Sequence, residues 1–231
     1  MSLKKSVGNM YDWVSHMHSH LGGECPHRCS YCYVQKNRFG VPERYKGGLR
    51  LIEKEFEVNY GSNKTIFIEH MNDMFATDVP RSWVDKILTH CQVHPNNLYV
   101  FQTKNPLRVL DFEGRLPRNH IIGTTIETNR EIEKGFAPTP RNRFIGIKKI
   151  SELGGKTFIT IEPVMDFDVD ILAQWVIEAQ PEFINIGADS KGCGLPEPTA
   201  EKILGFVEIL QKNKITIRKK VNLERILKEK T

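Results

Sequence analysis

The stretch that decides the fold class is Lys156-Thr-Phe-Ile-Thr-Ile161, which is followed directly by Glu162-Pro163. Its β-branched and aromatic residues make a short, nearly continuous apolar run, as expected for a strand that is buried on both faces. The proline ends the run, and a helical pattern follows near residues 169–179. This order is typical of one step in a parallel sheet, where a helix connects neighbouring strands.

The same unit recurs along the chain, and five further runs predict strands at residues 13–21, 64–69, 98–103, 120–126 and 183–187. Other helices are predicted near residues 80–94, 140–153 and 199–212. Six such units fit either an open doubly wound sheet or an incomplete barrel. A complete eight-stranded barrel takes about 250 residues, so a chain of 231 residues with six strands favours a partial (β/α)6 TIM-like barrel of the α/β class.

Composition excludes several other classes of protein. Hydrophobic residues make up 39% and charged residues 26% of the chain, which excludes a disordered chain. No apolar run approaches the roughly 18 residues needed to cross a bilayer, and no signal-peptide core follows the first residues. The sequence therefore predicts a cytoplasmic protein without a membrane partner. Five cysteines are too few, and odd in number, for a disulfide scaffold.

The net charge of +5 is concentrated at the C-terminal end. Residues 212–231 carry eight basic and two acidic side chains, a balance of +6, so the other 211 residues sum to −1. This segment starts with a strand pattern and ends with a helical one. We expect a single domain over residues 1–231 in which residues 212–231 cover the edge of the barrel; binding of a phosphate-rich partner is the alternative.

Three cysteines follow the first predicted strand in Cys25-Pro-His-Arg-Cys29-Ser-Tyr-Cys32. Functional residues of parallel α/β folds lie just after the strands, so this loop belongs to the expected functional end. Three thiolates on one tight loop can ligate three irons of a cubane cluster and leave the fourth iron open. A zinc site that uses His27 is the competing interpretation.

The spacing Cys-x3-Cys-x-aromatic-Cys resembles the signature of the radical S-adenosylmethionine (radical SAM) superfamily, with Tyr31 as the aromatic residue. The wider chain is similar to small radical-SAM-like proteins of phages and mobile elements. The stretches that carry this second resemblance are Ile66-Phe-Ile-Glu-His-Met-Asn-Asp-Met-Phe75, Phe101-Gln-Thr-Lys-Asn-Pro106, Gly123-Thr-Thr-Ile-Glu-Thr-Asn129, Ile161-Glu-Pro163 and Asn185-Ile-Gly-Ala-Asp189.

The resemblance implies a six-stranded partial barrel, a [4Fe-4S] cluster on Cys25, Cys29 and Cys32, and S-adenosylmethionine on the open iron. An external electron donor would reduce the cluster, and cleavage of S-adenosylmethionine would give a 5′-deoxyadenosyl radical. The substrate stays open, with a nucleotide or nucleic acid as one candidate.

The resemblance also suggests cofactor-binding residues near the strand ends. A Gly-Glu pair often binds the methionyl amine in the superfamily; here Asn72 and Asp73 are the candidates, or are loop caps. Thr125 and Glu127 share one face of the fourth predicted strand. Glu127 is a candidate for the ribose and Arg130 for the carboxylate, unless the stretch around Arg130 begins a solvated helix.

Charged residues at the ends of apolar strands are further candidates, because buried charge is costly unless it is paired. Lys104, Glu162 and Asp189 are expected to line the pocket and to pair among themselves, or to tie strands together. Cys193, after the sixth strand, is a candidate hydrogen-atom donor or a loop cysteine without a role. His20 is expected to point into the barrel. Cys91, within a helical pattern, is expected to pack in the core.

The sequence therefore predicts a radical SAM enzyme. Two alternatives from other classes use the same loop: a zinc-bearing binding module, and an iron–sulfur carrier without a nucleotide cavity.

Overall fold

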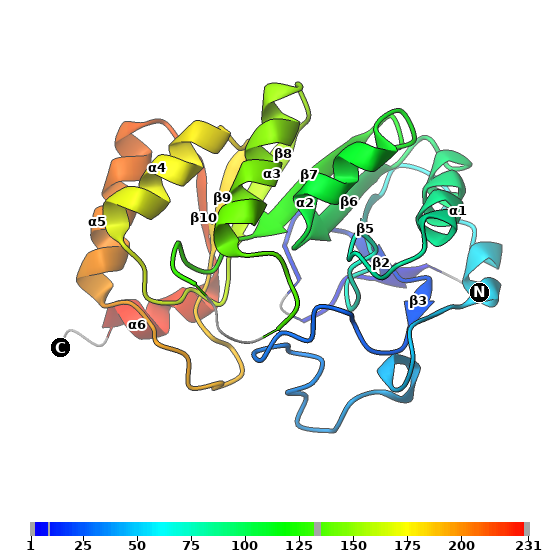
Figure 1. Cartoon of the computed structure of the whole chain (residues 1–231), viewed down its shortest axis with the longest axis horizontal. Coiled ribbons are helices and arrows are strands. Elements are labelled where there is room, and N and C mark those ends of the chain that lie inside the picture. The colour runs from blue at the N-terminus through cyan, green and yellow to red at the C-terminus, as the bar shows by residue number, and fades with distance from the viewer. Residues whose placement is uncertain (1–2, 9, 132–134, 229–231) are drawn as a thin grey trace.

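A twisted sheet of eight strands runs through the computed structural model, which describes residues 3–8, 10–131 and 135–228 (Figure 1). Its order is β1-β2-β5-β6-β7-β8-β9-β10, and every pairing is parallel except β1 with β2. The strands are β1 (Lys4–Lys5), β2 (His16–His18), β5 (Thr65–Ile68), β6 (Leu98–Thr103), β7 (His120–Thr125), β8 (Thr157–Ile161), β9 (Phe183–Ile186) and β10 (Ile217–Lys219).

Helices cover the outer face of this sheet, and α2 to α5 pack against one another in chain order (Figure 1). They are α1 (Arg81–Gln92), α2 (Pro106–Val109), α3 (Pro140–Glu152), α4 (Val169–Ala179), α5 (Ala200–Lys212) and α6 (Glu224–Lys228). Shorter 3-10 turns are η1 (Glu43–Tyr45), η2 (Glu53–Glu57), η3 (Leu110–Phe112) and η4 (Val221–Leu223). None of the helices in the described part of the chain is long and apolar enough to cross a membrane.

The predicted partial barrel is confirmed, with six parallel strands from β2 to β9 in the order expected. The first strand is shorter than predicted, because Leu21–Gly22 forms a separate strand, β3, that pairs with β4 (Arg50–Leu51). The basic C-terminal segment adds a seventh parallel strand, since β10 pairs with β9 and places Arg218 opposite Asn185. Lys230 and Glu229 of that segment lie outside the described residues.

Two apolar clusters divide the two faces of the sheet. The larger cluster lies between sheet and helices, while a smaller one fills the inner face near the strand beginnings. Its members include Phe67, Val100 and Phe158, and Tyr11 packs edge-on to Phe158. Residues two positions further along β6 and β8 share the same face, and these are the polar Gln102 and Thr160. The inner face of the sheet is therefore filled by apolar side chains near the strand beginnings and is polar near the strand ends.

Candidate active site

A cavity of about 560 Å³ lies at the carboxyl ends of the parallel strands. The cysteine loop forms one wall, and the residues that follow the strands form the others. Residues that line the cavity include Cys25, Cys29, Tyr31, Cys32, Asn72, Asp73, Lys104, Thr125, Glu162, Asp189 and Lys220. The structure thus brings together most of the sequence-predicted site residues, although they are up to about 160 positions apart in the chain.

The cysteine loop begins just after β3, and its three thiols are free and half-buried. Burial raises the pKa of the Cys25 thiol to about 12, and the nearby Asp73 carboxylate adds to this shift. Burial also raises the pKa of Cys29. Without a cation to stabilise them, these two thiols are therefore protonated at neutral pH.

Asp73 fastens the cysteine loop to the ends of β5 and β6. Its Oδ2 accepts hydrogen bonds from His27 Nε2 at 2.7 Å, from Thr103 Oγ1 at 2.9 Å and from the Lys104 backbone N–H at 2.8 Å. Its Oδ1 accepts from the Phe75 backbone N–H at 2.9 Å. Burial alone would raise the pKa of Asp73, but His27 and the other donors outweigh burial and hold it below its ordinary value. Both oxygens of Asp73 are thus engaged.

Asn72, the neighbouring candidate, differs from Asp73. Its Nδ2 donates to the Gly23 carbonyl oxygen at 3.2 Å, which also ties the start of the cysteine loop. Its Oδ1 is buried and has no hydrogen-bond partner among the described residues. A buried acceptor without a partner is costly, so this oxygen can accept a hydrogen bond from a ligand in the cavity.

Glu127 lies behind the cavity wall and is fully buried. Arg143 donates to its Oε2 at 2.7 Å, and both Lys104 Nζ and Tyr31 Oη donate to its Oε1. Burial opposes ionisation, but Lys104 and Arg143 outweigh it and lower the pKa of Glu127 to about 2. Lys104 Nζ also donates to Tyr31 Oη at 2.9 Å. Glu127 therefore holds the motif aromatic in place rather than lining the cavity.

Arg130 lies outside the cavity, on the surface. It pairs with Asp166 and with Asp168, the latter at 2.6 Å from Nη2 to Oδ1. Thr125, by contrast, lines the cavity and accepts a hydrogen bond from Gln102 Nε2 at 2.9 Å.

Lys104, Glu162 and Asp189 line the cavity as predicted, but they do not pair with one another, so that part of the prediction was wrong. The alternative, salt bridges that tie strands together, holds for Lys104 and Glu162. Lys104 pairs with Glu127, as described above, and Glu162 pairs with Lys220 at 2.8 Å. Asp189 accepts backbone N–H donors from Lys191 and Cys193, which shape its own loop. The reason is topological, because β10 brings Lys220 to the end of β8, and α3 brings its own cation to Glu127.

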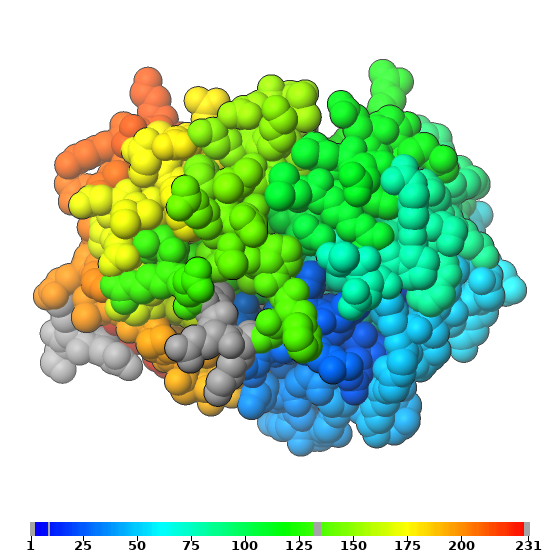
Figure 2. Space-filling model, in the orientation of Figure 1, coloured from blue at the N-terminus to red at the C-terminus, as the bar shows by residue number. Residues whose placement is uncertain are grey.

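Cys193 reaches the cysteine loop from the segment between β9 and α5. Its Sγ lies 4.0 Å from the Tyr31 carbonyl oxygen. In Figure 2 the blue N-terminal segment that carries the cysteine loop and the orange segment before α5 lie on the same lower side of the molecule. Cys193 is therefore next to the cysteine loop but not among the residues that line the cavity.

The residues at the floor of the cavity, Tyr11, Gln102 and Thr160, were not predicted from the sequence. Tyr11 Oη donates to Gln102 Oε1 at 2.7 Å and lies 2.6 Å from Thr160 Oγ1. Burial raises the pKa of Tyr11 well above its ordinary value, so its hydroxyl is neutral. Gln102 and Thr160 could have been found by strand alternation, whereas Tyr11 precedes the first strand and gives no periodic signal. Lys220 was also missed, because its basic segment predicts a solvated surface.

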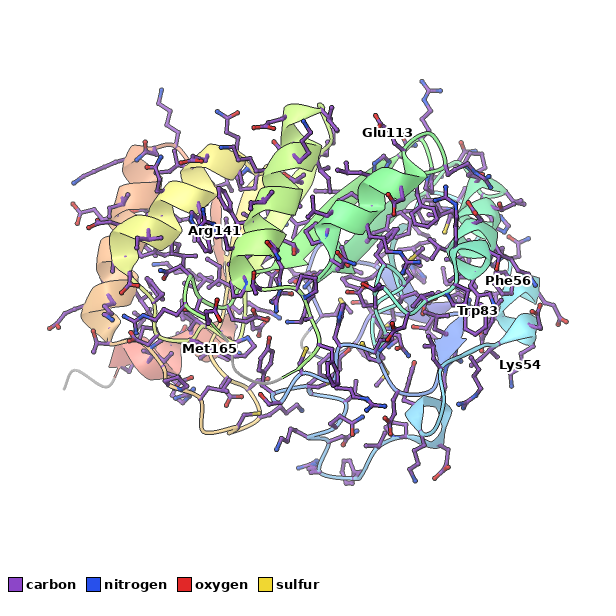
Figure 3. All side chains as sticks on the ribbon, viewed as in Figure 1. Lys54, Phe56, Trp83, Glu113, Arg141 and Met165 are labelled. Atoms are coloured by element: carbon purple, nitrogen blue, oxygen red, sulfur yellow. The ribbon has the colours of Figure 1, made fainter. Side chains whose placement is uncertain are left out.

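His20 does not point into the barrel, so that prediction was also wrong. It is fully buried on the outer side of β5, where His18, His90 and Tyr60 surround it. Phe56 covers the group, with its ring 4.6 Å from that of His20, and Figure 3 shows Phe56 and Trp83 at this end of the molecule. Cys91 is buried in α1, which confirms its packing role.

Acid is expected to destabilise the fold through four imidazoles whose pKa values are lowered by burial, those of His18, His20 and His90 and that of His70 in the cavity wall. Burial lowers the pKa of His20 to about 3, and those of His18, His70 and His90 to about 4. The unfolded chain takes up these protons first, near pH 6.5, so stability is full above that pH and is lost as pH falls toward 4. Burial raises the pKa of Glu69 to about 7, which acts in the opposite direction but is a single group.

Urea unfolding at pH 7 and pH 5 measures the net effect of the histidines and Glu69 on the free energy of unfolding. One pKa unit corresponds to about 1.4 kcal/mol, so we expect the free energy of unfolding to fall by about 3–6 kcal/mol between the two. The replacement His70→Gln should reduce this difference, while His16→Gln should reduce it less, because His16 is only partly buried and its pKa is lowered less than that of His70. Equal stability at pH 7 and pH 5 would contradict the prediction.

The fold and the site together define a partial α/β barrel with a cysteine loop at the mouth of a cavity. A family model described as protein of unknown function (DUF5131) matches residues 24–179, from the cysteine loop to the end of α4. Because that match covers more than half of the chain, the chain belongs to this family. None of the curated proteins matches the sequence.

Solved structures of radical SAM enzymes share the fold. A cysteine-to-serine mutant of spore photoproduct lyase has a TM-score of 0.59 and 13% identity, covering 89% of this chain and 65% of that chain. Streptococcus suis SuiB bound to S-adenosylmethionine has a TM-score of 0.60 and 11% identity, covering 88% of this chain and 50% of that chain. The chain thus spans less than two thirds of the length of these enzymes. At sequence identities of 11–13%, the similarity to these structures shows the fold alone.

Proposed function

We propose that the protein is a radical SAM enzyme in which Cys25, Cys29 and Cys32 hold a [4Fe-4S] cluster and S-adenosylmethionine binds in the adjoining cavity. The observation that carries the proposal is the position of the three cysteines. They stand in the spacing of the superfamily, on one loop, and all line a single cavity at the carboxyl ends of the strands. The fold is that of structures that contain S-adenosylmethionine.

The donor set fits such a cluster. Three thiolates are soft ligands that suit an iron–sulfur cluster. Among the described residues, no three His, Cys, Asp or Glu side chains converge as ligands of a single metal ion. A cluster does not require such convergence, because each cysteine binds a different iron. His27, the fourth ligand of the zinc alternative, is held by Asp73.

The cavity also fits the second cofactor. Its volume of about 560 Å³ falls in the range of ligand pockets, roughly 300–1,000 Å³. When bound, the two cofactors supply a reductive cleavage that yields an adenosyl radical. Asp73 and Glu127 hold the cysteine loop from two sides, through His27 and Tyr31, and Asn72 Oδ1 is the acceptor we assign to the methionyl amine.

Anaerobic reconstitution with iron and sulfide, followed by reduction, tests the proposal. We expect about four irons per chain and formation of 5′-deoxyadenosine from S-adenosylmethionine when an external reductant is supplied. Iron loading without any 5′-deoxyadenosine would instead favour the iron–sulfur carrier. Zinc without iron after anaerobic purification would favour the binding module.

Asn72→Ala is expected to weaken S-adenosylmethionine binding about tenfold, because the cavity loses the unpartnered oxygen. Asn72→Asp keeps an oxygen at that position and should retain the affinity, although both variants lose the Nδ2 bond to Gly23. Equilibrium dialysis with labelled S-adenosylmethionine on reconstituted protein measures the difference. Equal affinities for the two variants would remove Asn72 from the proposed site.

We propose a nucleotide or nucleic acid as the substrate class, and residues 212–231 as the segment that closes the barrel edge. The pairing of β10 with β9 supports the closure of the barrel edge. The basic side chains of Lys191 and Lys220, which line the cavity, support a phosphate-bearing substrate. One solved structure of spore photoproduct lyase contains a dinucleoside spore photoproduct together with S-adenosylmethionine. SuiB, in contrast, has been solved with a precursor peptide. Salt-dependent binding of an oligonucleotide that is lost when the exposed lysines of the segment are neutralised would support this substrate class.

A further inference from the structure

The buried histidine cluster lies beside the cavity, whose wall includes Glu69, and contains three hydrogen bonds in series. Glu69 Oε1 lies 2.9 Å from His20 Nδ1, His20 Nε2 lies 2.8 Å from His90 Nδ1, and His90 Nε2 lies 3.0 Å from the Val58 carbonyl oxygen. We call Glu69, His20 and His90 the histidine chain. Glu69 and both imidazoles are buried, and His20 is not exposed at all.

Counting protons along the histidine chain gives a definite result. Each of the three hydrogen bonds needs one proton, because a carbonyl oxygen and a carboxylate can only accept. Two neutral imidazoles carry one N–H each, so together they supply two protons. The third proton must therefore be an additional one, either on the Glu69 carboxyl group or on one of the imidazoles. Tyr60 Oη, 3.1 Å from His20 Nε2, can only accept from this nitrogen when Nε2 carries the proton donated to His90, so it does not change this count.

We propose that Glu69 is a neutral carboxylic acid in the folded protein and that it shares its proton with His20. The proton then lies between Glu69 Oε1 and His20 Nδ1, while His20 donates to His90 and His90 donates to Val58. This proposal rests on hydrogen-bond geometry and does not depend on the proposed function.

The surroundings support the neutral form over an ion pair. Burial raises the pKa of Glu69 to about 7 and lowers those of His20 and His90, so both partners favour their uncharged states. The titratable and charged groups that face the chain are His18 and Glu55, Arg44, Tyr60, His70, Cys91 and His94. Arg44 is itself paired with Glu55 at 2.6 Å, so that pair adds little net charge.

Glu69 acts as a positioning residue for the cysteine loop. Its Oε1 also accepts the His20 backbone N–H at 2.5 Å, and its Oε2 accepts the Leu21 backbone N–H at 3.2 Å. These residues lead directly into β3 and the loop that starts at Gly23. As pH rises through about 7, Glu69 loses its proton, and one hydrogen bond of the histidine chain is lost with it.

The replacement His90→Phe distinguishes two causes of the raised pKa of Glu69, proton sharing with His20 and burial alone. Without His90, His20 no longer has to donate from Nε2. Its single proton can move to Nδ1 and bond an ionised Glu69, while Tyr60 donates to Nε2. We therefore expect the pKa of Glu69 to fall by at least about one unit, a tenfold rise in its acid dissociation constant. If burial alone raised this pKa, the less polar phenyl ring would keep or increase it.

Carbon-13 NMR of the glutamate carboxyl carbons, assigned with Glu69→Gln, gives these values on the full chain. We expect a midpoint near 7 in the unmodified protein. His90→Gln, which can both accept from His20 and donate to Val58, should keep this midpoint, as should His94→Phe, whose ring lies 5.6 Å from that of His90. A midpoint near the ordinary value of about 4.3 in the unmodified protein overturns the proposal without any variant. So does a midpoint that stays the same or rises in folded His90→Phe.

Discussion

Cys29→Ala is expected to fold but to form no 5′-deoxyadenosine after anaerobic reconstitution. The variant lacks one of the three thiolates that line the cavity wall. Loss of an outer-sphere partner alone costs metal sites about 10–100-fold in affinity or activity, so removal of a direct ligand should cost at least about 100-fold. Iron content, the absorption of the cluster and the yield of 5′-deoxyadenosine measure the effect.

Cys91→Ala is the matched control, because Cys91 is a buried thiol of α1 that is not exposed at all. It removes a cysteine of the same chain without touching the loop, so iron content and product yield should match those of the unmodified protein. If Cys29→Ala retained its iron and its activity, the three-cysteine site would be ruled out. Unchanged circular dichroism in both variants shows that the fold is intact.

Glu127→Ala is expected to produce the largest loss of stability. The side chain accepts hydrogen bonds from Lys104, Arg143 and Tyr31, and its removal leaves the two cations, Lys104 and Arg143, without their carboxylate partner. Breaking a buried ion pair in this way costs about 3–5 kcal/mol. For a chain of this size, about 2–4 °C is lost per kcal/mol, so thermal unfolding should begin about 6–20 °C lower.

Arg130→Ala provides the control for Glu127→Ala from the same strand end. Arg130 makes ion pairs of comparable length with Asp166 and Asp168, but these lie at the surface and are screened by water. Exposed pairs contribute about 0–1 kcal/mol, so its melting temperature should change by a few degrees at most. A Glu127→Ala variant as stable as Arg130→Ala would show that Glu127 does not hold the loop as described.

The strands and helices of this protein could be predicted well because each of them carries its own local signal. Apolar runs bounded by Gly, Pro and Asn gave β5 to β9 within a residue or two, and amphipathic patterns did the same for α1, α3, α4 and α5. β2 was predicted too long, because its polar histidines alternate with apolar residues beyond the point where pairing with β5 stops. Strand β1 has only two residues and carries no such signal.

The partners of charged residues could not be predicted, because they come from segments that no local pattern connects. Glu127 and Arg143 are 16 positions apart, Glu162 and Lys220 58, and His20 and His90 70. Only the packing of α3, β10 and α1 decides which of these side chains come into contact. For the same reason His20 was predicted on the inner face, although the chain turns after β2 and directs it toward α1.

The sequence by itself determined the parallel α/β class, the six central strands and the position of the cysteine motif after the first of them, because these depend on hydrophobic period and on residue spacing. The tertiary structure decided which polar groups are satisfied and which are not. Asp73 and Asn72 are neighbours with similar side chains, yet four donors surround the first and one buried oxygen of the second has no partner among the described residues. Hydrogen-bond satisfaction and desolvation depend on atoms brought together from distant strands, so only the folded chain defines them.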